Sequence, residues 1–321
     1  MLATALTALF GLRHPIVLAP MGNVAGGRLA AAVTNAGALG IVGGGYGDAQ
    51  WVRRELDLAR ENAKGPWGIG FITWSMKPEL LELALSYRPA AFFLSFGDPR
   101  PHAAAIRAAG CRLVCQVQDL DGANLAREAG ADVIVAQGSE AGGHGGSRAT
   151  LPLVPAVIDA VSPTPVVAAG GIADGRGLAA ALALGAQGAL IGTRFFAASE
   201  SLAPPWAKRR LVEGRAERTA RTRVFDVVRG YDWPQPYTGR ALRNGFMDAW
   251  HGREAELDVA LATQRSAYQA ATDAGAENEY TVVWAGEGVD LIDRIDDAAT
   301  LVARIASEAE AQLRTAAALI R

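Results

Sequence analysis

Short, fully apolar runs alternate with segments of helical spacing along the first two-thirds of the chain. Eight of these runs have no polar face, which is typical of buried parallel strands rather than half-exposed antiparallel ones. The expected strands cover residues 16–19, 39–42, 67–72, 90–95, 112–117, 132–136, 166–169 and 189–191. The segments between them favour helices, and several end at glycine, as helix capping prefers. We expect these helices at 28–35, 48–62, 78–86, 101–109, 120–129, 153–161 and 174–184.

Eight strand–helix units within about 200 residues indicate an α/β fold of the (β/α)8 TIM-barrel class. A doubly wound open sheet is the alternative, because it also alternates strands with helices. The count of eight favours the barrel. Barrel enzymes carry their chemistry on the loops that follow the strand C-termini, so candidate functional residues are sought there.

The pattern changes after Ser201, where two prolines precede a basic run, an irregular stretch and a stretch of helical spacing. These three segments lie at 207–223, 231–237 and 242–268. We expect residues 204–280 to form a smaller, mainly helical cap over the barrel mouth. Residues 300–320 place their apolar side chains on one helical face and are expected to pack back on the barrel. The barrel domain then comprises residues 1–203 together with 281–321.

Composition excludes several classes of protein. Half of the residues are apolar and the formal net charge is −2, which gives no general case for binding nucleic acid or an anionic membrane. No apolar segment reaches membrane-spanning length, and no basic region precedes the apolar residues 2–10, so a cytoplasmic protein without a signal peptide is expected. The two cysteines, Cys111 and Cys115, are interpreted as buried and inert, and no spacing indicates a metal site.

Two neighbouring strands end in glycine-rich turns that suit a phosphate group. One strand leads into Gly170-Gly171 and the other into Gly192-Thr193. Glycine has no Cβ, so bare backbone N–H groups can approach an anion. Barrel enzymes often hold a phosphate after their seventh and eighth strands. The two turns therefore predict a ligand that carries a phosphate.

The loop at residues 137–146 follows the sixth expected strand and contains one histidine among many glycines. A neutral histidine, with an ordinary pKa near 6.5, can accept a proton at neutral pH. A histidine that only holds its own loop is the structural alternative, but the glycine density and the position at a strand end favour a catalytic base at His144. The basic run at 207–223 is interpreted as a solvated helix face, with attraction of an anionic co-substrate as its alternative.

The chain resembles the flavin-dependent nitronate monooxygenases, formerly called 2-nitropropane dioxygenases, and the related enoyl-ACP reductases and NADH:quinone reductases. The resemblance runs from His14 to about Glu200. It is carried by Ala19-Pro20-Met21, the loop at 137–146, the Ala-Gly-Gly-Ile turn at 169–172 and Gly192-Thr193-Arg194-Phe195.

The resemblance implies one FMN per barrel, with its phosphate on the N–H groups of Gly171, Gly192 and Thr193 and with His144 as the base or as a hydrogen-bond partner of the substrate. The implied cofactor-binding residues are Ala19, Pro20, Met21, Gly22, Gln116, Gln137, Gly142, Gly143, Gly170, Gly171, Gly192 and Thr193. Two positions depart from the family pattern. Gly70 stands where relatives usually have asparagine, and Gln116 stands where some have lysine.

The implied reaction is oxidation of alkyl nitronates, or of the nitroalkanes in equilibrium with them, by O2 to carbonyl compounds and nitrite. The substrate is then a small molecule. Two alternatives remain open. NAD(P)H could reduce the FMN, which would pass electrons to a quinone or an enoyl thioester. A barrel isomerase or aldolase without flavin could use the two turns for a phosphorylated substrate.

Overall fold

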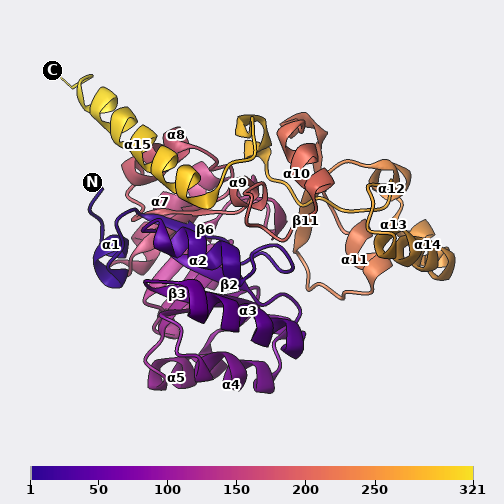
Figure 1. Ribbon diagram of the computed structural model, residues 1–321, viewed down its shortest axis with the longest axis horizontal. Helices are drawn as coiled ribbons and strands as arrows, with labels where there is room; N and C mark the ends of the chain where they lie inside the picture. Colours follow the sequence, from indigo (N-terminus) through magenta and orange to yellow (C-terminus); the bar gives the residue numbers. More distant parts are fainter. Residues whose placement is uncertain (1, 321) are drawn as a thin grey trace.

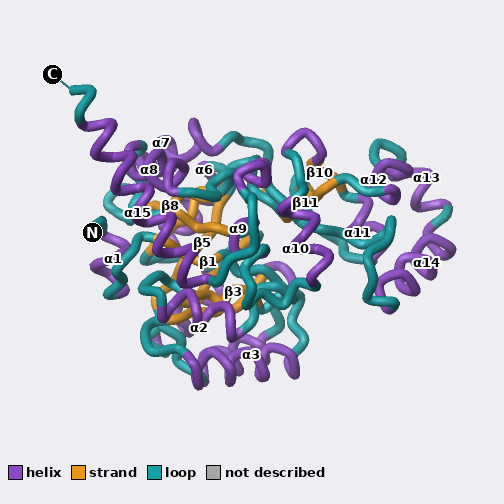
Figure 2. Tube along the Cα trace, turned by 45° about the horizontal axis from the view of Figure 1, so that its top comes forward, coloured by secondary structure: helices purple, strands orange, loops and turns teal. Residues whose placement is uncertain are grey.

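The computed structural model describes residues 2–320 and contains a closed barrel of eight parallel strands (Figures 1 and 2). Their order around the barrel is β1-β9-β8-β6-β5-β4-β3-β2. A parallel bridge between Val17 and Leu39 joins β1 to β2 and closes the ring. The TIM-barrel expectation is thereby confirmed over the open sheet. The strands are β1 (Ile16–Leu18), β2 (Gly40–Gly43), β3 (Trp67–Ile72), β4 (Ala91–Ser95), β5 (Arg112–Val117), β6 (Val133–Gln137), β8 (Val166–Ala169) and β9 (Ala189–Ile191).

Seven helices lie between successive strands, at the positions that the sequence predicts to within about three residues. They are α2 (Gly27–Asn35), α3 (Ala49–Asn62), α4 (Pro78–Ser86), α5 (Arg100–Ala108), α6 (Leu120–Glu128), α7 (Thr150–Val161) and α8 (Gly175–Ala183). Side chains of Asp48, Asp119 and Asp174 cap α3, α6 and α8 by accepting hydrogen bonds from first-turn N–H groups. These local capping signals explain why the helix starts are readable from the sequence.

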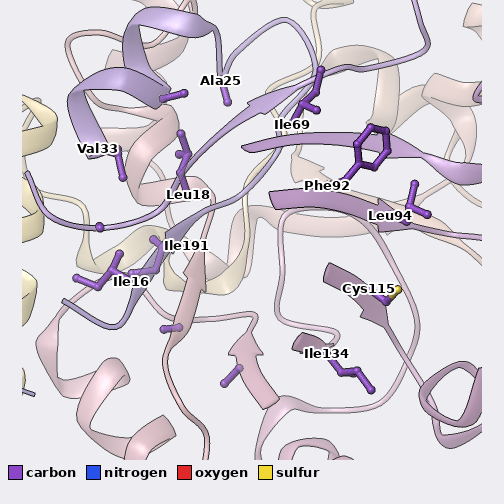
Figure 3. Close-up of a cluster of buried hydrophobic side chains, with 14 of the residues drawn as sticks. Ile16, Leu18, Ala25, Val33, Ile69, Phe92, Leu94, Cys115, Ile134 and Ile191 are labelled. Atoms are coloured by element: carbon purple, nitrogen blue, oxygen red, sulfur yellow. The ribbon is translucent and has the colours of Figure 1, made fainter. Parts of the chain in front are cut away.

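Strand side chains alternate between two apolar layers. Val17 faces the barrel interior, where the short helix α1 (Ala5–Phe10) contributes Leu6 and Phe10. Its neighbours Ile16 and Leu18 face the shell between strands and helices. Figure 3 shows side chains of this shell. The strands are therefore buried on both faces, as their uninterrupted apolar character predicts.

Both cysteines belong to the outer shell and neither forms a disulfide. Burial raises the pKa of the Cys115 thiol to about 12, so the thiolate needed for nucleophilic chemistry does not form at neutral pH. The expectation that both cysteines are buried is confirmed.

Beyond β9 the chain forms short helices and a second, three-stranded sheet, drawn to the side of the barrel in Figure 1. The sheet has the order β10-β11-β7 and is antiparallel. Its first strand, β7 (Gly143–Gly145), comes from the loop after β6. The other elements are α9 (Thr193–Phe196), α10 (Pro205–Val212), β10 (Thr219–Thr222), α11 (Val224–Arg229), β11 (Thr238–Leu242), α12 (Gly245–Trp250), α13 (Glu254–Val259), α14 (Leu261–Asp273) and the 3-10 turns η1 (Thr73–Ser75), η2 (Ala216–Arg218) and η3 (Glu287–Leu291).

The single helical stretch expected at 242–268 is wrong in detail. Leu242 ends strand β11, and the remainder is divided among α12, α13 and the first part of α14. Helix α12 starts where the Asn244 side chain accepts from the N–H of Met247, and it ends within two turns at His251. The helical spacing is real, but breaks at residues 251–253 and at Ala260 divide the segment into three helices.

The last helix, α15 (Ala298–Ala317), returns to the barrel and packs against α8 and α2. Leu301, Val302, Ile305 and Ala309 are buried on one face, as the amphipathic pattern predicts. In Figure 1 its C-terminal end projects beyond the barrel.

Candidate active site

A pocket opens at the C-terminal ends of the barrel strands. The space between its walls is about 1370 Å³, including the open mouth. Residues at or after the C-terminal ends of all eight barrel strands line the pocket, together with Arg229, Trp233 and Trp284 from beyond the barrel. The structure brings every sequence-predicted site residue to this pocket: Ala19, Pro20, Met21, Gly22, Gln116, Gln137, Gly142, Gly143, His144, Gly170, Gly171, Gly192 and Thr193.

The two glycine turns present unpaired backbone donors to the pocket. Within the described residues, the N–H groups of Gly171, Gly192 and Thr193 have no hydrogen-bond acceptor. Gly171 has φ +73°, a left-handed conformation that glycine adopts without strain. The Thr193 hydroxyl accepts from the N–H of Gly286 and ties the second turn to the segment before η3. A cradle of free N–H groups of this kind suits the oxygens of a phosphate.

Gln116 of β5 and Gly70 of β3 both line the pocket, on strands that β4 separates. The Gln116 side chain is buried, yet it forms no hydrogen bond within the described part of the chain, so its amide is available to a ligand. Gly70 lies inside β3, and a Cβ there would come within 2.5 Å of the Pro20 Cβ. A larger side chain at position 70 would therefore require Pro20 to move.

His144 is held by an extended segment rather than by a flexible loop. It lies in β7 and pairs with Gly239 of β11. The Gln137 side chain donates to the His144 carbonyl oxygen at 3.0 Å and accepts from Gln118 at 2.9 Å. Gln137 therefore uses its amide to fix the backbone of His144.

The basic run does not form a solvated helix face, so that interpretation is wrong. Only residues 205–212 are α-helical, and Lys208 is buried with its ammonium donating to the carbonyl oxygens of Ser199 and Ser201. Arg221 lies on β10, and its guanidinium donates to the carbonyl oxygens of Ser139, Gly145 and Thr238. Burial lowers the pKa of Arg221 to about 10, which leaves it charged at neutral pH. Its role is to hold the His144 loop onto the second sheet.

The imidazole of His144 is enclosed by three side chains from beyond the barrel. Its Nε2 lies 2.9 and 3.0 Å from the two carboxylate oxygens of Asp226, which is 1% exposed. Trp233 stacks on the ring with centroids 3.5 Å apart and 4° between the planes, and Trp284 lies 5.2 Å away at 51°. Burial lowers the pKa of His144 below its ordinary 6.5, although the hydrogen bond and charge of Asp226 act in the opposite direction. The imidazole is therefore neutral at pH 7, as a general base must be.

Aromatic side chains surround Trp233 at the pocket wall. Its indole N–H donates to the Tyr46 hydroxyl at 2.8 Å, and its edge meets the rings of Trp74 and Phe96. Tyr46 in turn stacks on Tyr231 at 3.8 Å. The irregular stretch at 231–237 thus places Trp233 in the site. This contact could not be predicted from the sequence, because the stretch has no hydrophobic periodicity that indicates which side chains are buried.

Among the residues that line the pocket, Arg229 is the one whose side chain is permanently charged. Its guanidinium lies over the Tyr231 ring at 4.6 Å and the Tyr46 ring at 5.8 Å, and it forms no ion pair within the described residues. Since no Asp, Glu or Lys lines the pocket, the local field favours an anionic ligand.

The residues around His144 that are not among the predicted site residues are Tyr46, Asp226, Arg229, Trp233 and Trp284. Asp226 and Arg229 lie one turn apart on α11, a spacing that predicts a shared helix face. Nothing in the sequence relates that face to His144, which lies 82 residues earlier in the chain than Asp226.

Within residues 2–320, no group of His, Cys, Asp and Glu has the arrangement of a metal site. The helices of the same range include none with the length and apolar character needed to cross a membrane.

Comparison with known proteins identifies relatives along nearly the whole chain. The family model of nitronate monooxygenase matches residues 3–81 and 72–308. The nitronate monooxygenase npaC of Metarhizium robertsii is 38% identical, with 95% of this chain and 94% of that protein aligned. The (3aS,4S,5R,7aS)-5-hydroxy-7a-methyl-1-oxo-octahydro-1H-indene-4-carboxyl-CoA dehydrogenase of Rhodococcus jostii is 41% identical over 70% of this chain and 64% of its own length. The structure of nitroalkane oxidase from Streptomyces ansochromogenes superposes with a TM-score of 0.81, at 32% identity over 98% of this chain and 99% of the other.

Proposed function

The chain belongs to the nitronate monooxygenase family of oxidoreductases, and from this premise we propose that it oxidises alkyl nitronates and the nitroalkanes in equilibrium with them. FMN is the proposed cofactor, O2 the oxidant, and a carbonyl compound and nitrite the products. The observation that supports this proposal most directly is that His144 lines the same pocket as the unpaired N–H groups of the two glycine turns.

The residues present fit an FMN. Free N–H groups at Gly171, Gly192 and Thr193 match the needs of a phosphate, and the unpartnered Gln116 amide is a hydrogen-bonding group for a polar chain or ring edge. Residues Pro20 to Gly22 supply a wall without charged groups. A bound flavin would take electrons from the nitronate and return them to O2, the redox step that no side chain of the pocket can perform.

The protein's own part is to bind the anion, remove a proton and enclose the reacting atoms. Arg229 provides the positive field that draws a nitronate into the pocket. When the neutral nitroalkane is the substrate, His144 accepts its α-proton. Trp233 and Trp284 limit the space next to the imidazole, so the substrate must be small or narrow at its nitro end.

We also propose that residues 204–280 act as a cap over the barrel mouth. Arg229 and Trp233 of this segment line the pocket together with the barrel residues, and Asp226 holds the His144 ring. The site is therefore completed by the segment that follows the barrel.

An absorbance spectrum followed by two additions tests the proposed reaction. We expect purified protein to show the visible absorption of a flavin, and added nitronate in air to consume O2 and release nitrite. Rapid anaerobic bleaching by NADPH or NADH, without nitronate turnover, would favour the reductase alternative. Colourless protein that takes up no FMN would favour the isomerase or aldolase alternative.

A further inference from the structure

Asp226 is a buried carboxylate whose side chain has a single partner. Both of its oxygens lie within hydrogen-bond distance of Nε2 of His144, at 2.9 and 3.0 Å. No other hydrogen bond or ion pair reaches this carboxylate within the described residues. A buried ionised carboxylate without a donor is costly, so the carboxylate and the imidazole N–H stabilise each other.

The helix α11 fixes the place of this carboxylate. Val224, Phe225 and Val228 of α11 are fully buried in an apolar cluster that includes Met247 and Leu257. Rotation of the short helix would expose these side chains to water, so the direction of the Asp226 side chain is set by packing.

We infer that Asp226 is the positioning residue of the site: it keeps the proton of neutral His144 on Nε2 and leaves the unprotonated Nδ1 as the basic atom that faces the substrate. This inference rests on the proposed function. An ionised carboxylate is only an acceptor, so the nitrogen that it contacts must carry the hydrogen. The hydrogen bond at one ring nitrogen thereby decides the state of the other.

The surroundings of the His144 ring leave Nδ1 as the atom that can accept a proton. Trp233 covers one face at 3.5 Å, and Trp284 lies obliquely at 5.2 Å. Nδ1 has no hydrogen-bond partner in the described part of the chain, although the ring as a whole lines the pocket. A lone pair in the ring plane is the orbital that accepts a proton, so an edge-on approach is productive.

The proton transfer from the nitroalkane to His144 requires no other reactant. Nδ1 of His144 forms a bond to the α-hydrogen of the nitroalkane, and the electron pair of the broken C–H bond moves into the nitro group to give the nitronate. The resulting imidazolium carries one positive charge next to the negative charge of Asp226. Asp226 therefore stabilises the charge that develops during the step, and it does so without contact with the substrate.

Nuclear magnetic resonance of the histidine nitrogens tests the tautomer directly. The chain has four histidines, so protein labelled with 15N-histidine gives few signals, and the His144→Gln variant identifies those of His144. We expect the wild-type His144 to carry its hydrogen on Nε2 at neutral pH. Asp226→Asn should raise the population with hydrogen on Nδ1, because the amide can donate to Nε2. Asp232→Asn, the same change at an exposed neighbour, should leave the spectrum unchanged.

Kinetics with two forms of the substrate separate positioning from folding. Asp226→Asn should lower kcat/KM for the neutral nitroalkane about 10²–10⁴-fold, the usual contribution of general base catalysis. Turnover of the pre-ionised nitronate should fall much less than that of the nitroalkane, because no proton has to be removed. Asp226→Glu retains the carboxylate and should restore part of the nitroalkane activity.

The inference is overturned if wild-type His144 carries its hydrogen on Nδ1, an outcome that needs no variant to fold. It is equally overturned if Asp226→Asn turns over nitroalkane as fast as the wild type. Equal losses with nitroalkane and nitronate would contradict it as well, since they indicate a structural role only. Failure of the wild type to turn over either substrate would instead end the proposed function, while the tautomer measurement still decides the role of Asp226.

Discussion

The indole of Trp233 lies flat against the imidazole of His144, with the ring centroids 3.5 Å apart and an angle of 4° between the planes. This contact joins the irregular stretch at 231–237 to the loop that follows the sixth barrel strand. It covers one face of the candidate base and at the same time forms a wall of the pocket. The same side chain therefore limits the access of substrate to the imidazole and packs against one face of the ring.

Replacing Trp233 tests this double role. Trp233→Phe keeps an aromatic ring but loses the indole N–H that donates to Tyr46. We expect a loss of about 0.5–1.5 kcal/mol in unfolding free energy for the lost hydrogen bond, together with a wider range of accepted nitronate chain lengths. Urea denaturation and a series of alkyl nitronates measure the two effects. Tyr46→Phe removes only the acceptor and is the control. A variant with wild-type stability and the wild-type chain-length preference would contradict the assignment.

Gly171→Ala tests the phosphate cradle. Gly171 has φ +73° and Gly275 has φ +65°, so alanine suffers a similar backbone strain at both positions, about 1–2 kcal/mol. Gly275 is exposed and remote from the pocket, and its variant is the matched control. We expect only Gly171→Ala to weaken FMN binding, measured by titrating the apoprotein with FMN. Riboflavin, which lacks the phosphate, should bind both variants as it binds the wild type. Equal FMN affinities of the two variants would remove the phosphate from this turn.

Arg229→Gln tests the electrostatic attraction of the substrate. The guanidinium is the one permanent charge among the lining residues, so its removal should raise KM for the nitronate anion several-fold and leave kcat little changed. Added salt should raise KM in the wild type and have a weaker effect in the variant, because salt screens the lost attraction. Arg209→Gln removes an exposed charge that lies outside the pocket and is the control. A KM for nitronate equal in all three proteins would contradict the role of Arg229.

The pH dependence of nitroalkane oxidation reports the state of His144. Burial holds the pKa of His144 below 6.5, so kcat/KM for the neutral nitroalkane should fall on acidification with a midpoint below that value. The pre-ionised nitronate should not show this limb. His144→Gln should abolish nitroalkane turnover while retaining bound FMN, and His251→Gln, at an exposed histidine, should behave as the wild type.

The lowered pKa of His144 also makes the unfolding free energy depend on pH. The unfolded chain protonates its histidine near pH 6.5, while the folded chain does so only at lower pH. The contribution of His144 to unfolding free energy is therefore complete above pH 6.5 and is lost as the pH falls through the lowered pKa. Thermal unfolding midpoints of wild type and His144→Gln, measured from about pH 5 to 8, check this difference. A gain in the relative stability of the wild type on acidification would contradict it.

The barrel was predictable because its signals are local. An uninterrupted apolar run such as 112–117 and a capping aspartate such as Asp119 act within a few residues of the structure they specify. Topology then brings the strand ends to one rim, which is why residues as distant in sequence as Pro20, Gln116 and Gly192 could be assigned to one pocket. The interpretation of the basic run at 207–223 as a solvated helix face is wrong. A charge pattern does not show whether a guanidinium contacts water or carbonyl oxygens, and that of Arg221 contacts carbonyl oxygens.

By itself the sequence determined the eight-stranded barrel, the two glycine turns and the glycine-framed histidine of an earlier loop, since each depends on the backbone preferences and the apolar character of neighbouring residues. Only the tertiary structure decided what surrounds that histidine. The contacts of Asp226 and Trp233 with His144 join segments that no periodicity relates. They form because α11 buries its apolar side chains against β11 and the helices that follow, while Trp233 packs against Trp74 and Phe96 of the barrel loops. Packing of this kind selects partners by shape and burial across long separations in the chain, and such information is not carried by any local pattern.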